Sequence, residues 1–129
     1  MEKKKILLVD DEKDFLALVK MNLEISGKFE VNTLSSTKDI ISQLHIFKPD
    51  LILLDLLMPG VGGIEACEML NNDPAGQRIP IIILSALDKD SDKRSAYKRG
   101  VVDYLVKPIE NDFLIARIEK ALEVKAADI

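Results

Sequence analysis

Short apolar segments alternate with longer amphipathic segments along the whole chain. The apolar segments, which we interpret as β-strands, fall at residues 5–10, 29–34, 50–55, 79–84 and 102–106. The amphipathic segments, which we interpret as helices, fall at residues 13–26, 37–47, 63–72, 88–99 and 110–125. Five repeats of a strand followed by a helix predict a parallel sheet with helices on both faces.

Several of these segments end where glycine or a polar run begins. Gly27 and Gly100 follow the first and fourth helix candidates, and glycine commonly ends a helix because it adopts the left-handed conformation. Residues 71–78 are the longest polar connection, and we interpret them as a surface loop. In the first helix candidate, the side that we expect to be buried carries Phe15, Leu18, Val19 and Leu23.

The order of the strands follows from the connections between them. Right-handed crossovers restrict the possible topologies, and 2-1-3-4-5 is the common order at this length. We therefore predict an α/β fold with a doubly wound five-stranded parallel sheet, in a three-layer α/β/α architecture of the flavodoxin-like type. Ligands of such sheets bind beyond the carboxyl ends of the strands, where the first and third strands are neighbours.

Composition limits the functions that the chain can have. Its 129 residues fit one domain, and 47% hydrophobic with 31% charged residues is a globular balance. A net charge of −4 argues against direct nucleic-acid binding, and no apolar run approaches the roughly 20 residues of a membrane span. The single cysteine, Cys67, suits a reducing cytoplasm and is expected to be a small buried residue. We expect one domain over residues 1–129, ordered from about 5 to 125, without an output domain.

Polar residues that can bind a metal or a phosphate follow four of the predicted strands. Asp10 and Asp11 end the first strand and Asp55 ends the third. Ser85 follows the fourth strand and Lys107 the fifth. Taken singly, each residue could be a helix cap or a surface side chain. Together, at one edge of the predicted sheet, they indicate a binding site.

The chemistry of this residue set points to phosphoryl transfer. Three carboxylates that converge in a low-dielectric site repel one another, so a divalent cation is the natural counter-ion. Ligands that are all oxygen favour a hard ion such as Mg²⁺. Asp55 can then attack a phosphoryl group and form an aspartyl phosphate. Lys107 would supply positive charge to the transferred oxygens, and the Ser85 hydroxyl would donate a hydrogen bond.

The chain resembles the receiver domain of bacterial two-component response regulators over essentially its whole length. The matching segments are Ile6–Glu12, Asp55 with Met58-Pro59 and Gly63, Ser85-Ala86, and Gly100–Pro108. The resemblance implies that Asp55 is the phosphoacceptor. It implies a Mg²⁺ site made of Asp10, Asp11, Asp55 and the backbone carbonyl of Leu57. The switch and phosphate-binding residues that it implies are Ser85, Tyr104, and Lys107 with a cis peptide bond to Pro108.

The resemblance also implies partners. A histidine kinase or a phosphotransfer protein would donate the phosphoryl group, and Tyr104 would turn inward as Ser85 moves toward the phosphoryl oxygens. The face that repacks would be formed by residues 88–99, 102–106 and 110–125. An output domain or a target protein would bind this face, and two phosphorylated chains could dimerise. The chain would be a signalling domain, not an enzyme, apart from its own phosphorylation and dephosphorylation.

Some residues allow more than one interpretation. Arg117 and Asp103 either pair across a dimer or pair within one chain, which we favour. His45 lies in the second helix candidate, away from the acidic edge, so we expect it to be a bystander. Leu57 and Leu87, two positions after Asp55 and Ser85, cannot orient a water molecule, which predicts a long-lived aspartyl phosphate.

Two alternative functions remain open from the sequence. The first is a receiver-like docking module that acts without phosphorylation, although the intact acidic set argues against it. The second is a phosphatase of the haloacid-dehalogenase type, which also uses an aspartyl nucleophile with Mg²⁺. That class needs an acid two residues after its nucleophile, where this chain has Leu57.

Overall fold

The computed structural model describes the backbone of residues 2–58 and 60–127 and the side chains of these residues up to residue 123. Pro59, part of the matching segment Met58-Pro59, lies outside the described residues. Strands and helices alternate along it as the sequence predicts. In chain order, the elements are β1 (Lys4–Val9), α1 (Lys13–Ile25), β2 (Phe29–Leu34), α2 (Ile40–Ile46), β3 (Leu51–Leu54), α3 (Gly63–Asn71), the 3₁₀ helix η1 (Gly76–Arg78), β4 (Ile81–Ser85), α4 (Asp90–Lys98), β5 (Asp103–Val106) and α5 (Asn111–Ala127). None of the described helices has the length and apolar character that crossing a membrane requires.

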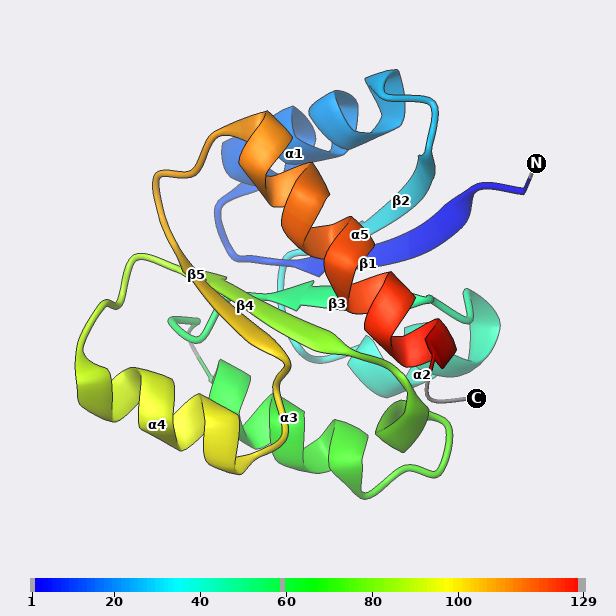
Figure 1. Ribbon diagram of the computed structural model, residues 1–129. Helices are drawn as coiled ribbons and strands as arrows, with labels where there is room; N and C mark the ends of the chain where they lie inside the picture. The colour runs from blue at the N-terminus through cyan, green and yellow to red at the C-terminus, as the bar shows by residue number, and fades with distance from the viewer. Residues whose placement is uncertain (1, 59, 128–129) are drawn as a thin grey trace.

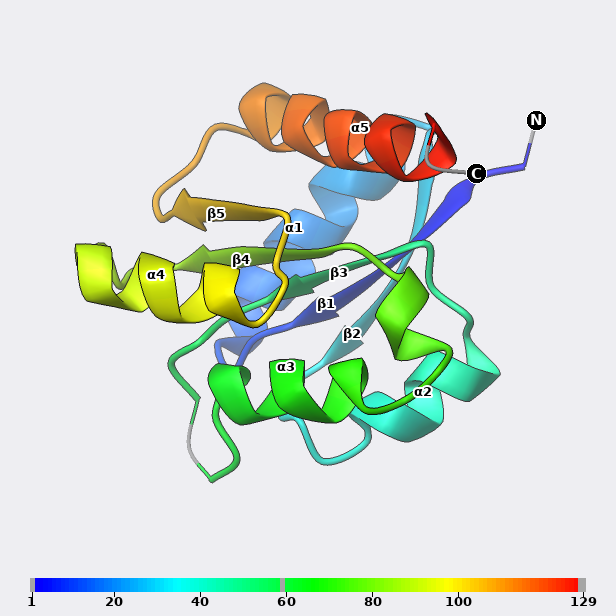
Figure 2. The same cartoon turned by 60° about the horizontal axis from the view of Figure 1, so that its bottom comes forward.

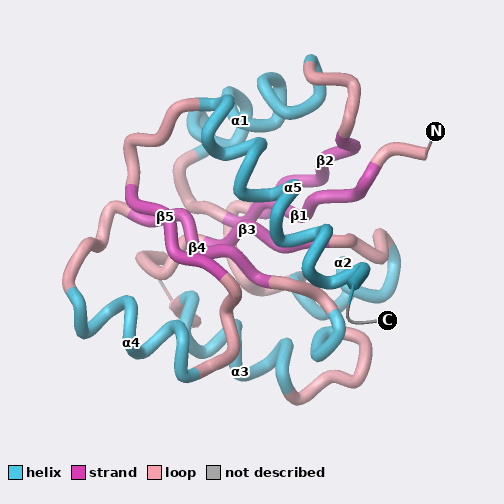
Figure 3. Tube along the Cα trace, in the orientation of Figure 1, coloured by secondary structure: helices cyan, strands magenta, loops and turns pink. Residues whose placement is uncertain are grey.

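The five strands form one parallel sheet in the order β2-β1-β3-β4-β5, which confirms the predicted topology (Figure 1). Val9 of β1 is opposite Leu54 of β3, so the residues that follow these two strands are neighbours. Ser85 of β4 is opposite Val106 of β5. The loops after β4 and β5 leave the sheet on the same side, on the left of the view in Figure 3. The polar residues at the strand ends therefore share one edge.

Two layers of helices cover the sheet and create two separate cores. Helices α1 and α5 lie on one face, and α2, α3 and α4 lie on the other (Figure 2). Successive residues of β1 alternate between the cores: Ile6 and Leu8 pack with α1 and α5, whereas Leu7 and Val9 pack with α2, α3 and α4. Every residue of β3 and β4 is buried, which fits the continuous apolar runs Leu51–Leu54 in β3 and Ile81–Leu84 in β4, before the buried Ser85.

The buried side of α1 differs from the prediction at one position. Leu16, Val19 and Leu23 face the core, whereas Leu18 is 53% exposed, so its assignment to the buried side is wrong. Residues 16, 19 and 23 follow the i, i+3, i+7 spacing of one helical stripe, and Leu18 lies well off that stripe. Phe15 is partly buried and packs against the same core, as expected.

Two connections also differ in detail from the expected boundaries. Helix α2 begins at Ile40, not at residue 37, because Thr37 is buried in the preceding turn and its hydroxyl donates a hydrogen bond to the Val61 carbonyl (2.9 Å). The polar segment 71–78 contains the 3₁₀ helix η1 and the buried Gly76, so it is more ordered than a simple surface loop. Gly27 and Gly100 adopt positive φ angles of 78° and 86° after α1 and α4, which fits their predicted role as helix stops.

Candidate functional site

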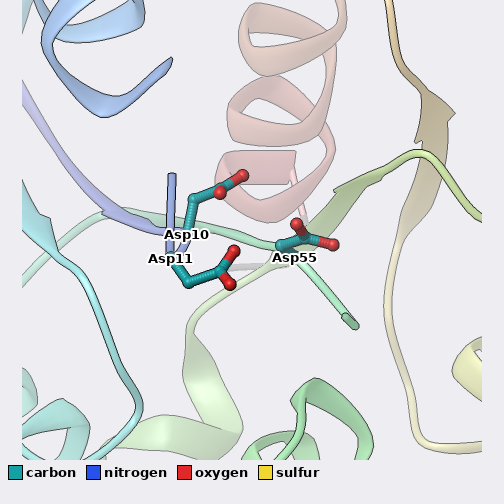
Figure 4. A group of neighbouring side chains, drawn as sticks. All are labelled: Asp10, Asp11 and Asp55. Atoms are coloured by element: carbon teal, nitrogen blue, oxygen red, sulfur yellow. The ribbon is translucent and has the colours of Figure 1, made fainter. Parts of the chain in front are cut away.

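Three carboxyl groups meet where β1 and β3 end. Asp10 and Asp55 are 1% and 4% exposed, and Asp11 lies at the surface beside them. One oxygen from each of the three groups lies within 4.8 Å of the other two, and Figure 4 shows the carboxyl groups around one small space. The cluster offers only oxygen atoms as ligands, and two of its three acids are buried. Such a set of ligands fits a hard divalent cation.

Backbone N–H groups fix the orientation of the two buried carboxylates. The N–H of Glu12 donates to Oδ1 of Asp10 (2.9 Å), and the N–H of Leu57 donates to Oδ1 of Asp55 (3.0 Å). Each acid thus closes a turn with the residue two positions later, a local arrangement that aspartate favours. As a result, the Oδ2 atoms of both acids lie next to Lys107.

Lys107 brings its ammonium group into the acidic cluster from the end of β5. Its Nζ lies 2.6 Å from Oδ2 of Asp10, 3.3 Å from Oδ2 of Asp55 and 3.3 Å from Oε1 of Glu12. The side chain is only 11% exposed, so its contacts with Asp10 and Asp55 lie mostly out of water, whereas Glu12 is exposed. Its N–H donates to the Ser85 carbonyl (2.9 Å), and its peptide bond to Pro108 is cis. Lys107 is therefore the cation that balances the buried acids.

Burial and this ion pair shift the pKa values of Asp10 and Lys107. Burial raises the pKa of Asp10 above its usual value, although the hydrogen bond from Lys107 pulls it down. Burial alone would lower the pKa of Lys107, but Asp10 and Asp55 outweigh burial and raise that pKa above its usual value. Lys107 stays protonated at neutral pH, yet one lysine does not offset all the neighbouring acids. The site retains negative charge that a metal ion would neutralise.

The backbone of Leu87 contacts both predicted switch residues, one through its N–H and the other through its carbonyl. Ser85 is fully buried, and its Oγ accepts a hydrogen bond from the Leu87 N–H (3.3 Å). The Tyr104 hydroxyl donates to the Leu87 carbonyl (2.7 Å), and its side chain is buried. Burial raises the pKa of Tyr104 to about 12, so its hydroxyl remains a donor at neutral pH. The loop after β4 is thus bonded to both residues.

Two residues at the site were not predicted to take part in it. Glu12 was not singled out for the site, but its carboxylate contacts Lys107. The Phe15 ring, expected only in the core, lies 4.0 Å from Nζ of Lys107, measured to the ring centroid. The spacing of Phe15 is that of an ordinary buried helix residue. The contact depends on how α1 packs beside the end of β5, which the sequence pattern does not describe.

Other polar residues lie away from the acidic cluster. His45 Nε2 is 2.8 Å from Oδ2 of Asp73 in the loop after α3, and this hydrogen bond lowers the pKa of Asp73. Cys67 is buried in α3, as predicted, and burial raises its pKa to about 11. The Cys67 thiol is therefore unreactive at neutral pH.

Arg117 and Asp103 form a pair within the chain, as we favoured from the sequence. The Nε and Nη2 atoms of Arg117 each lie 2.6 Å from one carboxylate oxygen of Asp103. This fork-like contact joins α5 to the start of β5. It occupies both carboxylate oxygens of Asp103, so a dimer contact through the same two residues would have to replace it.

Comparisons with known proteins match most of the chain. The family model described as the response regulator receiver domain matches residues 6–119. The phosphate regulon transcriptional regulatory protein PhoB of Rhizobium meliloti is 39% identical over 92% of this chain and 52% of its own length. The alkaline phosphatase synthesis transcriptional regulatory protein PhoP of Bacillus subtilis is 38% identical, over 92% of this chain and 48% of its own length. The chain thus spans about half the length of these relatives.

A solved structure supports the fold independently. A CheY-like response regulator receiver domain protein from Methanospirillum hungatei superposes with a TM-score of 0.91. The match covers 99% of this chain and 100% of that protein. At 22% sequence identity, the likeness concerns the fold alone.

Proposed function

We propose that Asp55 accepts a phosphoryl group and thereby switches the face formed by α4, β5 and α5, since this chain belongs to the family of response regulator receiver domains. Membership of the family makes the chain a receiver of two-component signalling. The observation that carries the role of Asp55 is its place: it is buried after β3, beside two further acids and a lysine. Few other groups are needed, since phosphoryl transfer depends mostly on positioning and charge neutralisation.

The residues of the acidic cluster would divide the chemistry among them. Asp10, Asp11 and Asp55, with the Leu57 carbonyl, would hold Mg²⁺, which neutralises charge on the transferred oxygens when bound. The Asp55 carboxylate attacks the phosphorus of a phosphohistidine whose other ring nitrogen is protonated: an O–P bond forms, the P–N bond breaks, and a neutral imidazole leaves with that proton. Lys107 then turns its ammonium group from the carboxylates toward the phosphoryl oxygens.

The switch would act through the loop that follows β4. The Ser85 hydroxyl, which now accepts a hydrogen bond from the Leu87 N–H, would donate a hydrogen bond to a phosphoryl oxygen and shift the backbone at Leu87. Tyr104 is already buried and bonded to the Leu87 carbonyl in the structure. We therefore expect phosphorylation to stabilise this inward arrangement by a population shift, not to create it.

The partners follow from the same assignment. A histidine kinase or a phosphotransfer protein would supply the phosphoryl group in the cytoplasm. An output domain or a separate target would bind the α4-β5-α5 face, and dimerisation through this face is a further outcome of phosphorylation. Residues from about 5 to 125 would act as one receiver unit. The Arg117–Asp103 pair would have to open if those two residues formed the dimer contact.

The direct test is phosphorylation by a small donor. With acetyl phosphate and Mg²⁺, the intact mass should increase by one phosphoryl group, and EDTA should prevent the increase. The Asp55→Asn variant should show no increase, whereas Asp73→Asn, in a loop away from the site, should behave as wild type. A folded wild-type protein that gains no mass would favour the docking module. Sustained hydrolysis of phosphate esters would favour the phosphatase.

The aspartyl phosphate should be long-lived because apolar side chains flank Asp55. Leu57 is 61% exposed beside it, and Leu87 is partly exposed in the next loop. Neither side chain can hydrogen-bond a water molecule for attack on phosphorus. We expect Leu57→Asn or Leu87→Glu to shorten the lifetime about tenfold or more, since a side chain that hydrogen-bonds the attacking water should assist hydrolysis by at least this much. The measurement is the decay of the phosphorylated mass after the donor is removed.

Val61→Asn provides the control for this lifetime experiment. Val61 lies in the same loop as Leu57 and is also exposed, but it does not occupy either of the two flanking positions. Its variant should retain the wild-type decay rate. If the decay rate stays unaltered in both leucine variants as well, the apolar flanks do not determine the lifetime.

A further inference from the structure

An aromatic ring lies against the lysine of the phosphorylation site. Phe15 belongs to the first turn of α1, and Lys107 follows β5 near the other end of the chain. Their contact, 4.0 Å from Nζ to the ring centroid, is the shortest of three cation–aromatic contacts in the described residues. The other two, Lys5 over Phe47 and Arg117 over Phe113, measure 5.5 and 5.3 Å.

The surroundings of Lys107 strengthen this contact. Its ammonium group bonds to Asp10, Asp55 and Glu12, and its side chain is 11% exposed. Phe15 is itself held in place, because it packs against the core between the sheet, α1 and α5. A cation is attracted to the face of an aromatic ring, and more strongly where water is largely excluded. The ring thus adds attraction for the ammonium group that an aliphatic side chain of similar size would lack.

We propose that Phe15 is a positioning residue for phosphoryl transfer, whose ring keeps the Lys107 ammonium group at the acidic edge while its hydrogen bonds change. This inference rests on the proposed function of Asp55. Before transfer, Lys107 is bonded to carboxylates; during transfer, it must donate to phosphoryl oxygens instead. Attraction to a ring face does not depend on one hydrogen-bond direction, so it persists through such a shift. The ring therefore limits the displacement of the ammonium group between its carboxylate-bonded and phosphoryl-bonded states.

The first test compares phosphorylation rates with acetyl phosphate at saturating Mg²⁺. Phe15→Leu should react about three- to tenfold more slowly, which corresponds to the strength of a partly desolvated cation–aromatic contact. Phe15→Tyr, which keeps the ring, should restore a rate close to wild type. Phenylalanine analogues with one and three ring fluorines should slow the reaction stepwise, because fluorine weakens the negative face of the ring and changes its volume little.

The matched control removes another ring that lies over a lysine. Phe47→Leu changes the Lys5 contact at the entrance of β1, far along the sheet from the strand ends, and it also removes buried apolar surface. It should lower stability without changing the phosphorylation rate of the folded protein. A decrease equal to that of Phe15→Leu would overturn the proposal, because general loosening of the fold would then explain both.

A second readout needs no phosphoryl donor. Protons on Cε of Lys107 should show an upfield ring-current shift in the NMR spectrum of the wild type, and Phe15→Leu should lose it. Absence of this shift in the wild type would overturn the proposal. So would rates that do not vary across the fluorinated series while the shift is present. A wild type that shows the shift but is never phosphorylated on Asp55 would instead identify the proposed function as the point of failure, and the positioning role would fall with it.

Discussion

Replacement of Gly63 by alanine is expected to destabilise the fold by about 3 kcal/mol, near the upper end of what overpacking usually costs. Gly63 is the first residue of α3 and packs directly on the backbone after β3. A Cβ atom there would lie 2.5 Å from the Asp55 carbonyl oxygen and 2.6 Å from Cα of Leu56. Both are backbone atoms, of the buried Asp55 and the partly buried Leu56, so neither can move aside as a flexible side chain would.

The same collision should impair the site. Relieving it requires α3 to move away, or the Asp55–Leu56 backbone to move within the sheet edge that holds Val9 and Asp10. A displacement of about 1 Å at a reacting group can cost about 10²-fold in rate. We expect the phosphorylation rate of folded Gly63→Ala to decrease by about this factor. Urea denaturation and acetyl phosphate kinetics measure the two effects separately.

Gly62→Ala is the matched control for this prediction. Gly62 precedes Gly63, has φ −76°, and its added Cβ would meet mainly the flexible carboxylate of Glu65 at 3.0 Å. Its variant should lose less than about 1 kcal/mol, since alanine is only a weaker cap than glycine at this position. Equal stabilities for the two variants would show that the Asp55–Leu56 backbone tolerates the methyl group.

The sequence was most informative about the sheet. Strands buried on both faces leave unbroken apolar runs, and parallel strands must be separated by helices, so the order and the shared edge follow from few rules. The position of Asp10 beside Asp55 is a direct consequence of that order, as the β1–β3 register shows. The buried side of α1 does not follow from the sequence pattern alone. Its apolar residues cover more than one stripe, and only packing decides that Leu16 is buried and Leu18 is not.

The contacts within the site were harder to predict than its members. The residue types at the strand ends indicate a site for a metal and a phosphate, because three acids, a hydroxyl and a lysine at one sheet edge have few other chemical uses in combination. Neither the Leu87 backbone that contacts Ser85 and Tyr104 nor the Phe15 ring over Lys107 leaves a pattern in the sequence. One is a backbone group with no residue preference, and the other has the spacing of a core residue.

Replacement of Lys107 by methionine is expected to destabilise the metal-free protein by about 3 kcal/mol at neutral pH, because it leaves two buried carboxylates without their cation. Asp10 and Asp55 would lose their contacts of 2.6 and 3.3 Å with the ammonium group. The contact with the exposed Glu12 should matter little. Urea denaturation in EDTA measures the change, and Mg²⁺ should recover much of it, since a bound cation stabilises only the folded state.

The pH dependence of this loss distinguishes unpaired charge from lost packing. Burial raises the pKa of Asp10 in the wild type, and Lys107 opposes that rise. Without Lys107, the pKa of Asp10 in the folded state should rise further. An acid whose pKa is higher in the folded state than in the unfolded state stabilises the fold when the pH is below its pKa in the unfolded state. This contribution is lost as the pH rises through the pKa of the acid in the folded state. The deficit of Lys107→Met should therefore grow from about pH 4, near the ordinary aspartate pKa, toward neutral pH.

Lys28→Met is the control, because Lys28 forms a solvent-exposed pair with Glu119 (3.3 Å). Its variant should change stability by less than about 1 kcal/mol, with no comparable dependence on pH or Mg²⁺. A deficit in Lys107→Met that is the same at pH 4 and at neutral pH would mean that packing of the lysine stem, not its charge, supports the site. If the loss of stability in Lys107→Met disappears both in acid and with Mg²⁺, the negative charge of the acidic cluster destabilises the folded protein. Lys107 then balances this charge until the metal binds.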